Sequence, residues 1–340
     1  MAANVLDFER PIRDLEALID ELRTPEKRAE AEAQGLDLDS EIARLEAELR
    51  SVIERIFARL TPWEQTLLSR HPNRPYTLDY VHRIFDDFLE LSGDRLSGND
   101  EAVVGGPAFL DGRPVMVIGH QKGRELRERQ QRNFGSAHAE GYRKALRLAK
   151  MAERFRRPLI SFVDTSAAAA DLAAEERGVS EAIATNMAVF SGLRIPIVVI
   201  VIGEGGSGGA IGLAVGDRVL MLEHAVYSVI PPEGCAAILW RDKNRAPEAA
   251  AALRMTARDA LELGVVEEVL PEPLGGAHRD PAGMAATIKE AILRHLSELD
   301  KVSAEKLVRT RYRRFRSMGR WMELTPAETA EAEQPQAAPL

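Results

Sequence analysis

The feature that most constrains the fold is an apolar segment that leads directly into a glycine-rich turn. Residues 196–202 are apolar at almost every position and rich in β-branched side chains, which is typical of a strand with both faces covered. Five glycines follow between Gly203 and Gly209, and small residues that suit a helix come next. Glycines permit a sharp turn and the close approach of a ligand or another backbone. Free amides at the start of the helix can stabilise negative charge on an oxygen.

Other short apolar runs predict further strands, each bounded by Gly, Pro or Asp: residues 102–110, 114–119, 158–163 and 218–222. Helical patterns separate them at 141–156 and 175–192, and a helical region follows at 256–299, interrupted by a turn at 271–276. Strands that alternate with helices of this length indicate an α/β domain with crossover connections.

The first 60 residues have a different pattern. Apolar residues recur at steps of three and four, which predicts two amphipathic helices between residues 8 and 60, the second with its N-cap at Ser40. We expect them to form a hairpin that lies on the main body or on another subunit, because each apolar stripe needs a surface to cover it.

Composition narrows the class of protein. The net charge of −8 does not favour nucleic acid or an anionic membrane as a partner, and no apolar run reaches the roughly 20 residues that span a bilayer. The single cysteine, Cys235, excludes an internal disulfide and a cysteine-based zinc site within one chain. We expect a cytoplasmic protein. Six arginines at 309–320 predict a solvated or subunit-facing helix.

Spacing alone leaves several interpretations of the glycine turn. A phosphate loop is disfavoured because no Gly-Lys-Ser/Thr follows, and a dinucleotide site lacks an acidic residue at the required distance. A purely structural turn stays open. So does a serine-hydrolase elbow, because the residues around Ser207 match G-x-S-x-G in a strand–turn–helix context, with a histidine and an acid supplied by the fold.

Longer motifs give the chain a family resemblance. They are R-P-Y-T-L-D-Y (74–80), D-G-R-P-V-M-V-I-G-H-Q-K-G-R-E (111–125), E-G-Y-R-K-A-L-R-L (140–148), A-E-E-R-G-V-S-E-A-I-A (174–184), V-I-G-E-G-G-S-G-G-A (201–210), Y-S-V-I-P-P-E-G-C (227–235) and P-E-P-L-G-G-A-H-R (271–279). Together with L-D-F-E-R-P-I (6–12), these motifs resemble the alpha subunit of the acetyl-coenzyme A carboxylase carboxyltransferase family, in the same order and over nearly the whole chain.

The resemblance implies a crotonase-like (ClpP/crotonase) α/β fold of repeated β-β-α units, with an N-terminal helical hairpin. We expect an N-terminal helical region at 1–95 and a carboxyltransferase domain with C-terminal helices at 96–322. The tail at 323–340 is expected to be disordered, because it is poor in large apolar side chains. The implied reaction moves a carboxyl group from carboxybiotin, held on a separate carrier protein, to acetyl-coenzyme A. The product, malonyl-coenzyme A, commits carbon to fatty acid biosynthesis.

The implied partners are a beta subunit with a zinc ribbon, the biotin carboxyl carrier protein and biotin carboxylase, in an assembly of two alpha and two beta chains. The metal then belongs to the beta chain. A divergent paralogue of weak or no activity, which keeps only the fold and the assembly role, is the alternative within the family.

The resemblance also implies site residues. Backbone amides of Gly208 and Gly209, supported by Gly205 and Gly206, hold an oxyanion, and this charge-stabilising role needs amides more than an ionised side chain. Independently of the resemblance, His120, Lys122 and Arg124 are candidates for substrate binding, because they follow a predicted strand, where loop residues often meet ligands. Lys122 and Arg124 are suited to a phosphate or carboxylate, and a solvated loop stays open as the alternative. The resemblance adds the backbone of Ala167 and Ala168 on the opposite wall.

Two segments depart from the family pattern. Residues 164–171 read D-T-S-A-A-A-A-D where the family has D-T-P-G-A-Y-P-G, and residues 136–139 read S-A-H-A where it tends to have M-P-A-P. The first change removes prolines and glycines that fix the backbone, and a ring that could pack on a ligand. Both changes fall in loops expected near the active centre, so fold and assembly are better supported than turnover.

Overall fold

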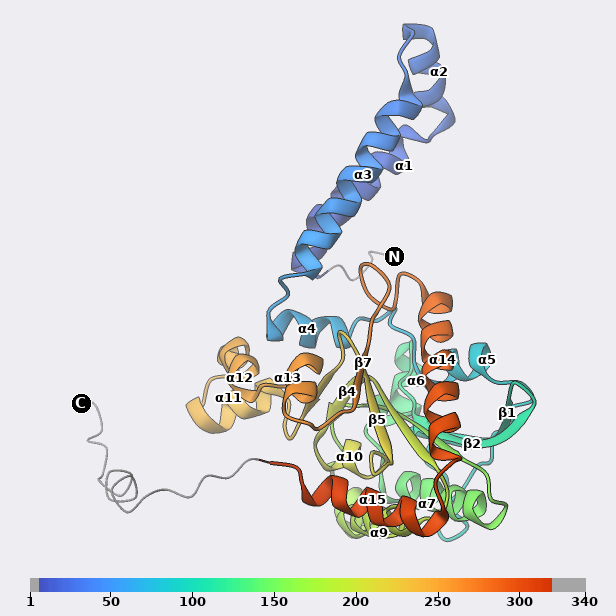
Figure 1. Cartoon of the computed structure of the whole chain (residues 1–340). Coiled ribbons are helices and arrows are strands. Elements are labelled where there is room, and N and C mark those ends of the chain that lie inside the picture. Colours follow the sequence, from blue (N-terminus) through green and yellow to red (C-terminus); the bar gives the residue numbers. More distant parts are fainter. Residues whose placement is uncertain (1–5, 320–340) are drawn as a thin grey trace, which may run out of the picture.

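The computed structural model describes residues 6–319 and places a seven-stranded sheet at the centre of the chain (Figure 1). The strand order is β1-β2-β3-β4-β5-β7, and the short β6 pairs with the end of β4. The strands are β1 (Val103–Leu110), β2 (Arg113–His120), β3 (Leu159–Thr165), β4 (Ile197–Gly206), β5 (Arg218–Leu222), β6 (Val226–Ser228) and β7 (Glu268–Leu270). The strands expected from the apolar runs are all present.

Local sequence explains how the sheet begins. β1 and β2 form an antiparallel hairpin closed by Asp111 and Gly112, which both have positive φ, the geometry that an Asp-Gly pair favours in a two-residue loop. The pairs from β2 through β3, β4 and β5 to β7 are parallel. All ten residues of β4 are buried, which confirms that both faces of this strand are covered.

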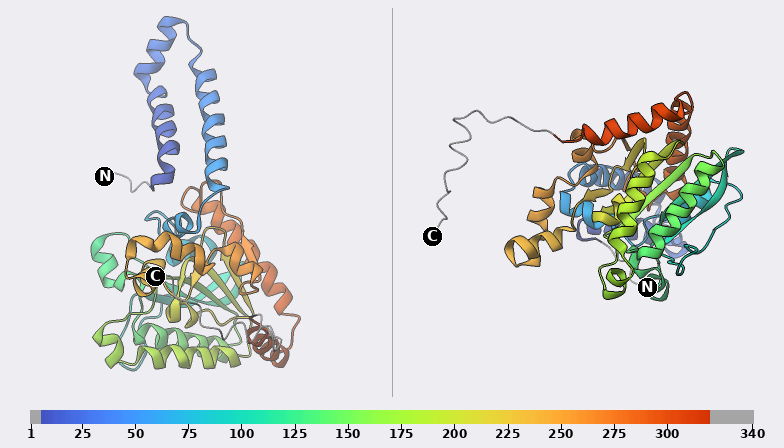
Figure 2. Two further views of the ribbon diagram at one scale, coloured as in Figure 1. Left: turned by 90° about the vertical axis from the view of Figure 1, so that its left-hand side faces the viewer. Right: turned by 90° about the horizontal axis from the view of Figure 1, so that it is seen from below.

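Helices cover both faces of the sheet (Figures 1 and 2). α7 (Ala139–Arg154) packs on β1 and β2 and against α9 (Val179–Gly192), which contacts α15 (Ala304–Arg316). On the other face lie α5 (Thr77–Ile84) and α14 (Pro281–Leu299). The shorter helices are α4 (Pro62–Ser69), α6 (Leu126–Gln131), α8 (Leu172–Glu176), α10 (Ser207–Ile211), α11 (Pro232–Trp240), α12 (Ala246–Leu253) and α13 (Ala257–Glu262).

Between residues 8 and 60 there are three α-helices instead of the two predicted: α1 (Arg10–Leu22), α2 (Pro25–Gln34) and α3 (Leu38–Phe57). α2 forms the tip, begins at a proline and ends at Gly35, whose φ of 66° stops the helix. Asp37, not Ser40, caps α3, and its carboxylate accepts a hydrogen bond from the Ser40 amide at 3.1 Å. α1 and α3 cover each other's apolar stripes, so the hairpin stands away from the body (Figure 2).

One residue of the arginine-rich helix α15 departs from the expected solvated helix, while Arg309, Arg313 and Arg316 are exposed. Arg311 is 1% exposed, and its guanidinium donates to Asp217 at 2.7 and 3.0 Å. It also donates to the carbonyls of Phe190, Leu193 and Ile195. A buried arginine needs this full set of acceptors, and α15 is thereby fixed to the start of β5.

The tail predicted for 323–340 lies outside the described residues, and the domain boundary at residue 95 stays a prediction. Within residues 6–319, no helix combines the length and apolar character needed to cross a bilayer.

The base of the hairpin meets the body through Glu9 and two histidines. The rings of His71 and His278 stack with centroids 4.1 Å apart, and their Nε2 atoms lie 3.9 and 3.6 Å from the Glu9 carboxylate. These ligand atoms are close enough together to suit a metal ion. However, the Asn73 amide donates to Nδ1 of His71, so the neutral ring carries its proton on Nε2, the atom that faces Glu9. The cluster therefore fits a joint held by charge and ring stacking better than a metal site.

This joint makes stability depend on pH. Burial lowers the pKa of His71 to about 4, and the histidines and the Leu6 amide lower that of Glu9. As the pH falls, the unfolded chain binds a proton at His71 near pH 6.5, whereas the folded chain does so only near pH 4. The free energy of unfolding therefore decreases between these two pH values, by on the order of 2 kcal/mol. Urea unfolding of the full chain between pH 7.5 and 4.5 measures this slope. His71→Gln should make the slope shallower, with the contributions of the other buried histidines His120 and His224 left in place, and the exposed-site variant His82→Gln should not. Equal slopes for wild type and His71→Gln would contradict the assignment.

Candidate active site

The glycine turn lies where β4 ends and α10 begins, next to the ends of β3 and β6. Thr165 of β3 pairs with Gly205, and β6 pairs with Glu204, Gly205 and Gly206 on the other side. Ser207 is the first residue of α10 and has a φ of 55°, a backbone conformation that residues other than glycine rarely adopt. Ser207 and Gly208 are the partly exposed residues of the turn, which leaves them accessible to a ligand.

The loop after β3 lies against the turn and touches it through backbone atoms. A Cβ added to Gly206 would overlap the Ser166 carbonyl group, and one added to Gly209 would lie 2.5 Å from the Ala168 nitrogen. At Gly208 the nearest atom to an added Cβ is 3.7 Å away. Gly206 and Gly209 are therefore needed for packing between the two walls, whereas Gly208 borders open space.

A cluster of buried charges supports the turn from below. The Lys122 ammonium lies 2.7 Å from Asp164 and 2.9 Å from Glu204, and Arg70 lies 2.6 Å from the second oxygen of Glu204. The carboxylate of Asp164 also accepts the amide of Glu204 at 2.9 Å. Despite burial, Lys122 and Arg70 hold the pKa of Glu204 below its usual value, and the two carboxylates raise the pKa of Lys122. The four groups fix the ends of β2, β3 and β4 to one another.

The structure brings the predicted residues His120 and Lys122 to the turn but places them inside the protein. The His120 ring is fully buried beside the backbone of Gly209 and Phe162, and burial lowers its pKa to about 3, so it is neutral. Arg124 is not part of this group. Its guanidinium donates to Asp79 and to the Pro72 carbonyl and lies over the ring of Tyr76.

Sequence reasoning missed Arg70, Asp164 and Glu204. Glu204 interrupts an otherwise apolar and glycine-rich run, and a buried strand with an acidic residue needs a cation nearby, so this signal was available. No local pattern identifies Arg70, which is 134 residues away from Glu204.

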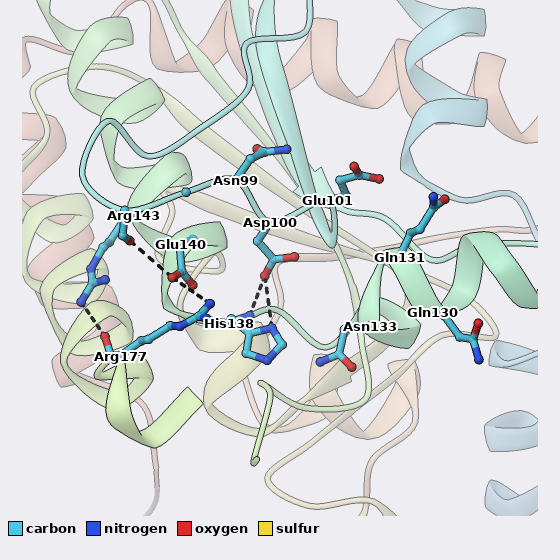
Figure 3. A pocket seen from close by; sticks show the side chains of 12 residues that line it. Asn99, Asp100, Glu101, Gln130, Gln131, Asn133, His138, Glu140, Arg143 and Arg177 are labelled. Carbon is cyan, nitrogen blue, oxygen red and sulfur yellow. Dashed lines mark hydrogen bonds and ion pairs between the residues drawn. The ribbon is translucent and has the colours of Figure 1, made fainter. Parts of the chain in front are cut away.

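A narrow pocket of about 10 Å³, enough for about one water, borders the site between Arg70, Ser166 and the turn. A second, polar cavity of about 740 Å³ has His138 in its wall (Figure 3). Its lining residues are Ser97, Gly98, Asn99, Asp100, Glu101, Gln130, Gln131, Asn133, His138, Glu140, Arg143 and Arg177.

Comparison with known families decides what this arrangement belongs to. A sequence model of the acetyl co-enzyme A carboxylase carboxyltransferase-like family matches residues 5–319. The chain belongs to this family. The resemblance carried by the motifs is thereby confirmed.

Curated proteins are similar in sequence to this chain over nearly their full length. The acetyl-coenzyme A carboxylase carboxyl transferase subunit alpha of Geobacter metallireducens is 54% identical over 318 residues, covering 94% of this chain and 98% of the relative. The protein of the same name from Vibrio campbellii is 53% identical over 319 residues, with 94% and 99% covered.

Solved structures confirm the crotonase-like fold. Transcarboxylase 12S aligns with a TM-score of 0.52 at 20% identity, over 64% of this chain and 41% of that chain. The beta subunit of Pseudomonas aeruginosa geranyl-CoA carboxylase aligns with a TM-score of 0.53 at 16% identity, over 73% and 46%. A Pseudomonas malonate decarboxylase hetero-tetramer in complex with coenzyme A gives 0.53 at 18%, over 65% and 89%. At these identities the likeness concerns the fold alone.

Proposed function

We propose that this chain is the alpha subunit of an acetyl-coenzyme A carboxylase carboxyltransferase. It transfers the carboxyl group of carboxybiotin to acetyl-coenzyme A and gives malonyl-coenzyme A. The observation that carries this function is the near full-length match to carboxyl transferase alpha subunits at 52–54% identity, with the glycine turn complete.

The turn is suited to the charge that this reaction develops. Carboxyl transfer places negative charge on the ureido oxygen of biotin and on the thioester oxygen of the acetyl group, and fixed amides stabilise such charge most where they are already oriented. Gly208 and Gly209 are the proposed donors, and Gly205 and Gly206 set the shape of the turn. The partial exposure of Ser207 and Gly208 fits this role, because a ligand can reach the start of α10.

The remaining site residues take supporting parts in the proposal. Ala167 and Ala168 present backbone to the turn from the opposite wall. His120 acts from the buried side of the turn, and Lys122, whose side chain is 13% exposed, holds the strand ends through Asp164 and Glu204. For Arg124 we propose contact with substrate through its half-exposed guanidinium, which would have to give up its bond to Asp79.

The proposed partners follow from the same assignment. They are a beta subunit that carries a zinc ribbon, the biotin carboxyl carrier protein and biotin carboxylase, in the cytoplasm, with two alpha and two beta chains per carboxyltransferase. Carboxybiotin arrives on the carrier protein, and the second substrate is a coenzyme A thioester. The narrow pocket at the turn supports a beta subunit, because about 10 Å³ is far too small to enclose either substrate.

The direct test is co-expression with a beta subunit of this family, followed by assay of malonyl-coenzyme A formed from acetyl-coenzyme A and carboxybiotin. We expect turnover from the purified complex and none from either chain alone. A well-formed complex without turnover would establish the divergent paralogue instead and overturn the proposed activity.

Ser207 favours one competing activity, because its positive φ and its G-x-S-x-G context match a nucleophile elbow. Within residues 6–319, however, no hydrogen bond joins its hydroxyl to a histidine, as an activated serine requires. We therefore predict that a fluorophosphonate probe leaves Ser207 unlabelled and that Ser207→Ala changes carboxyl transfer by less than about threefold. Trypsin serves as the positive control for the probe. Labelling that Ser207→Ala abolishes would instead support a hydrolase.

A further inference from the structure

The two loops that depart from the family pattern lie against each other. The amide of Ala169, in the 166–171 loop, donates to the carbonyl of Ala137, in the segment before α7, at 2.9 Å. Nε2 of His138 lies 2.9 Å from a carboxylate oxygen of Asp171. One backbone and one side-chain contact therefore join the two segments in which this chain differs.

His138 is itself held from the side opposite Asp171. The carboxylate of Asp100 accepts the His138 amide at 2.6 Å and lies 3.9 Å from Nδ1 of the ring, as Figure 3 shows at the edge of the polar cavity. Asp100 is 8% exposed, and its loop is anchored by the buried Lys144, which donates to the Asp100 carbonyl at 2.7 Å. The histidine is thus fixed to the main body before it contacts the 166–171 loop.

Asp171 is fixed in turn to the loop that forms the wall of the site. One of its carboxylate oxygens accepts the Ala174 amide at 2.8 Å and caps α8, while the other faces His138. Between Thr165 and Asp171, the backbone of Ser166 and Ala168 is in contact with Gly206 and Gly209. A displacement at Asp171 would therefore be transmitted directly to the glycine turn.

We infer that His138 and Asp171 are positioning residues for the carboxyl transfer, a pair that holds the 166–171 wall against the glycine turn. Proline restricts a backbone through its ring and glycine permits special turns, but residues 166–170 contain neither. In this loop, polar contacts restrict the backbone instead. The inference rests on the proposed function for its effect on rate, although the geometry of the loop can be tested independently. Neither side chain contacts the turn itself, so both act through the loop backbone.

The variants to compare are His138→Ala, His138→Gln and Asp171→Asn, each in the complex with a beta subunit. Asn at 171 still caps α8 but presents an amide donor to the histidine, and Gln at 138 keeps a donor near the position of Nε2. Asp280→Asn is the matched control, because Asp280 caps α14 through the Gly283 amide in the same way and has no histidine partner.

We expect His138→Ala and Asp171→Asn each to lower kcat about tenfold, because a wall misplaced by a fraction of an ångström orients the reacting groups poorly. KM for acetyl-coenzyme A should change by less than about twofold, since oriented amides act mainly on the transition state. His138→Gln should recover most of kcat. The double variant should lose no more than the worse single variant, because the two side chains form one contact.

Hydrogen exchange of the peptide covering 164–175 provides the readout that does not depend on activity. Exchange should speed up at least several-fold in the two pair-breaking variants and stay unchanged in Asp280→Asn. Unchanged kcat, unchanged exchange or an equal loss in Asp280→Asn would overturn the positioning role. A wild-type complex without turnover would refute the proposed function, and unchanged exchange would then still refute the pair.

Discussion

Gly206→Ala should reduce carboxyl transfer by at least about a hundredfold, because the added methyl group occupies the position of the Ser166 carbonyl. The overlapping atoms belong to backbone on both sides, so no side chain can rotate to make room. Either the 166–171 wall or the glycine turn must move by more than an ångström, and the amides proposed to hold the oxyanion move with it. The measurement is kcat of the complex with a beta subunit, with the melting temperature recorded for each variant.

Two further glycine-to-alanine variants distinguish the clash with the opposite wall from the general effect of replacing a glycine. Gly192→Ala, at the end of α9, has no atom within 4 Å of the added Cβ and should behave like wild type. Gly208→Ala lies in the same turn, keeps its amide and has free space, so it should lose less than about tenfold. If Gly206→Ala retained as much activity as Gly208→Ala, close contact between the walls would not be needed for the reaction.

The same glycines show what spacing in the sequence can establish. The run from β4 into the turn predicted a buried strand, a sharp turn and exposed amides, because these follow from local composition and chain stiffness. Which glycines touch the opposite wall depends on where a loop 40 residues earlier in the chain lies, as the contact between Gly206 and Ser166 illustrates. Local patterns contain no information on that placement, so only the resemblance assigned roles to individual glycines.

The strands were predicted well, and the N-terminal helices were predicted less well, for a physical reason. β5 has the bounds expected from its apolar run, since a buried parallel strand reads as continuous apolar sequence. α2 was missed because its apolar residues are one proline and three alanines, with no large apolar side chain, and helix prediction relied on apolar periodicity. Its signals were the proline at position 25 and the glycine at position 35, which mark the start and end of a helix.

The sequence around Glu204 signals that a cation lies nearby, but the identity of the residues that form the buried charge cluster and the contact between the two altered loops were beyond prediction from sequence. Lys122 was selected as a possible ligand for phosphate or carboxylate, and the carboxylates that it meets belong to Asp164 and Glu204 of the same chain. The altered loops were each recognised as departures, but the approach of His138 to Asp171 arises from the fold, which places the segment before α7 against the loop after β3. The topology of the fold brings together charged residues that lie tens of residues apart in the sequence. No local sequence pattern specifies which of them will pair.

Lys122→Met should lower the free energy of unfolding by about 3–5 kcal/mol, because it leaves two buried carboxylates with one cation fewer. Arg70 still neutralises Glu204, so the uncompensated charge falls mainly on Asp164. Urea unfolding of the full chain at neutral pH measures the loss. Arg113→Met is the control, because the pair of Arg113 with Asp300 is substantially exposed and should contribute less than about 1 kcal/mol.

The pH dependence and a second substitution test whether the missing Lys122 charge causes the loss of stability in Lys122→Met. In the wild type, Glu204 has a lowered pKa and contributes stability above about pH 4.5 that is lost as the pH falls. In Lys122→Met, protonating a carboxylate relieves repulsion, so the deficit relative to wild type should shrink as the pH falls toward 5. Adding Asp164→Asn should recover most of the loss at neutral pH, since the amide oxygen can still accept the Glu204 amide. A deficit that is independent of pH and unchanged in the double variant would mean that Lys122 stabilises the site by packing its alkyl chain, not by its charge.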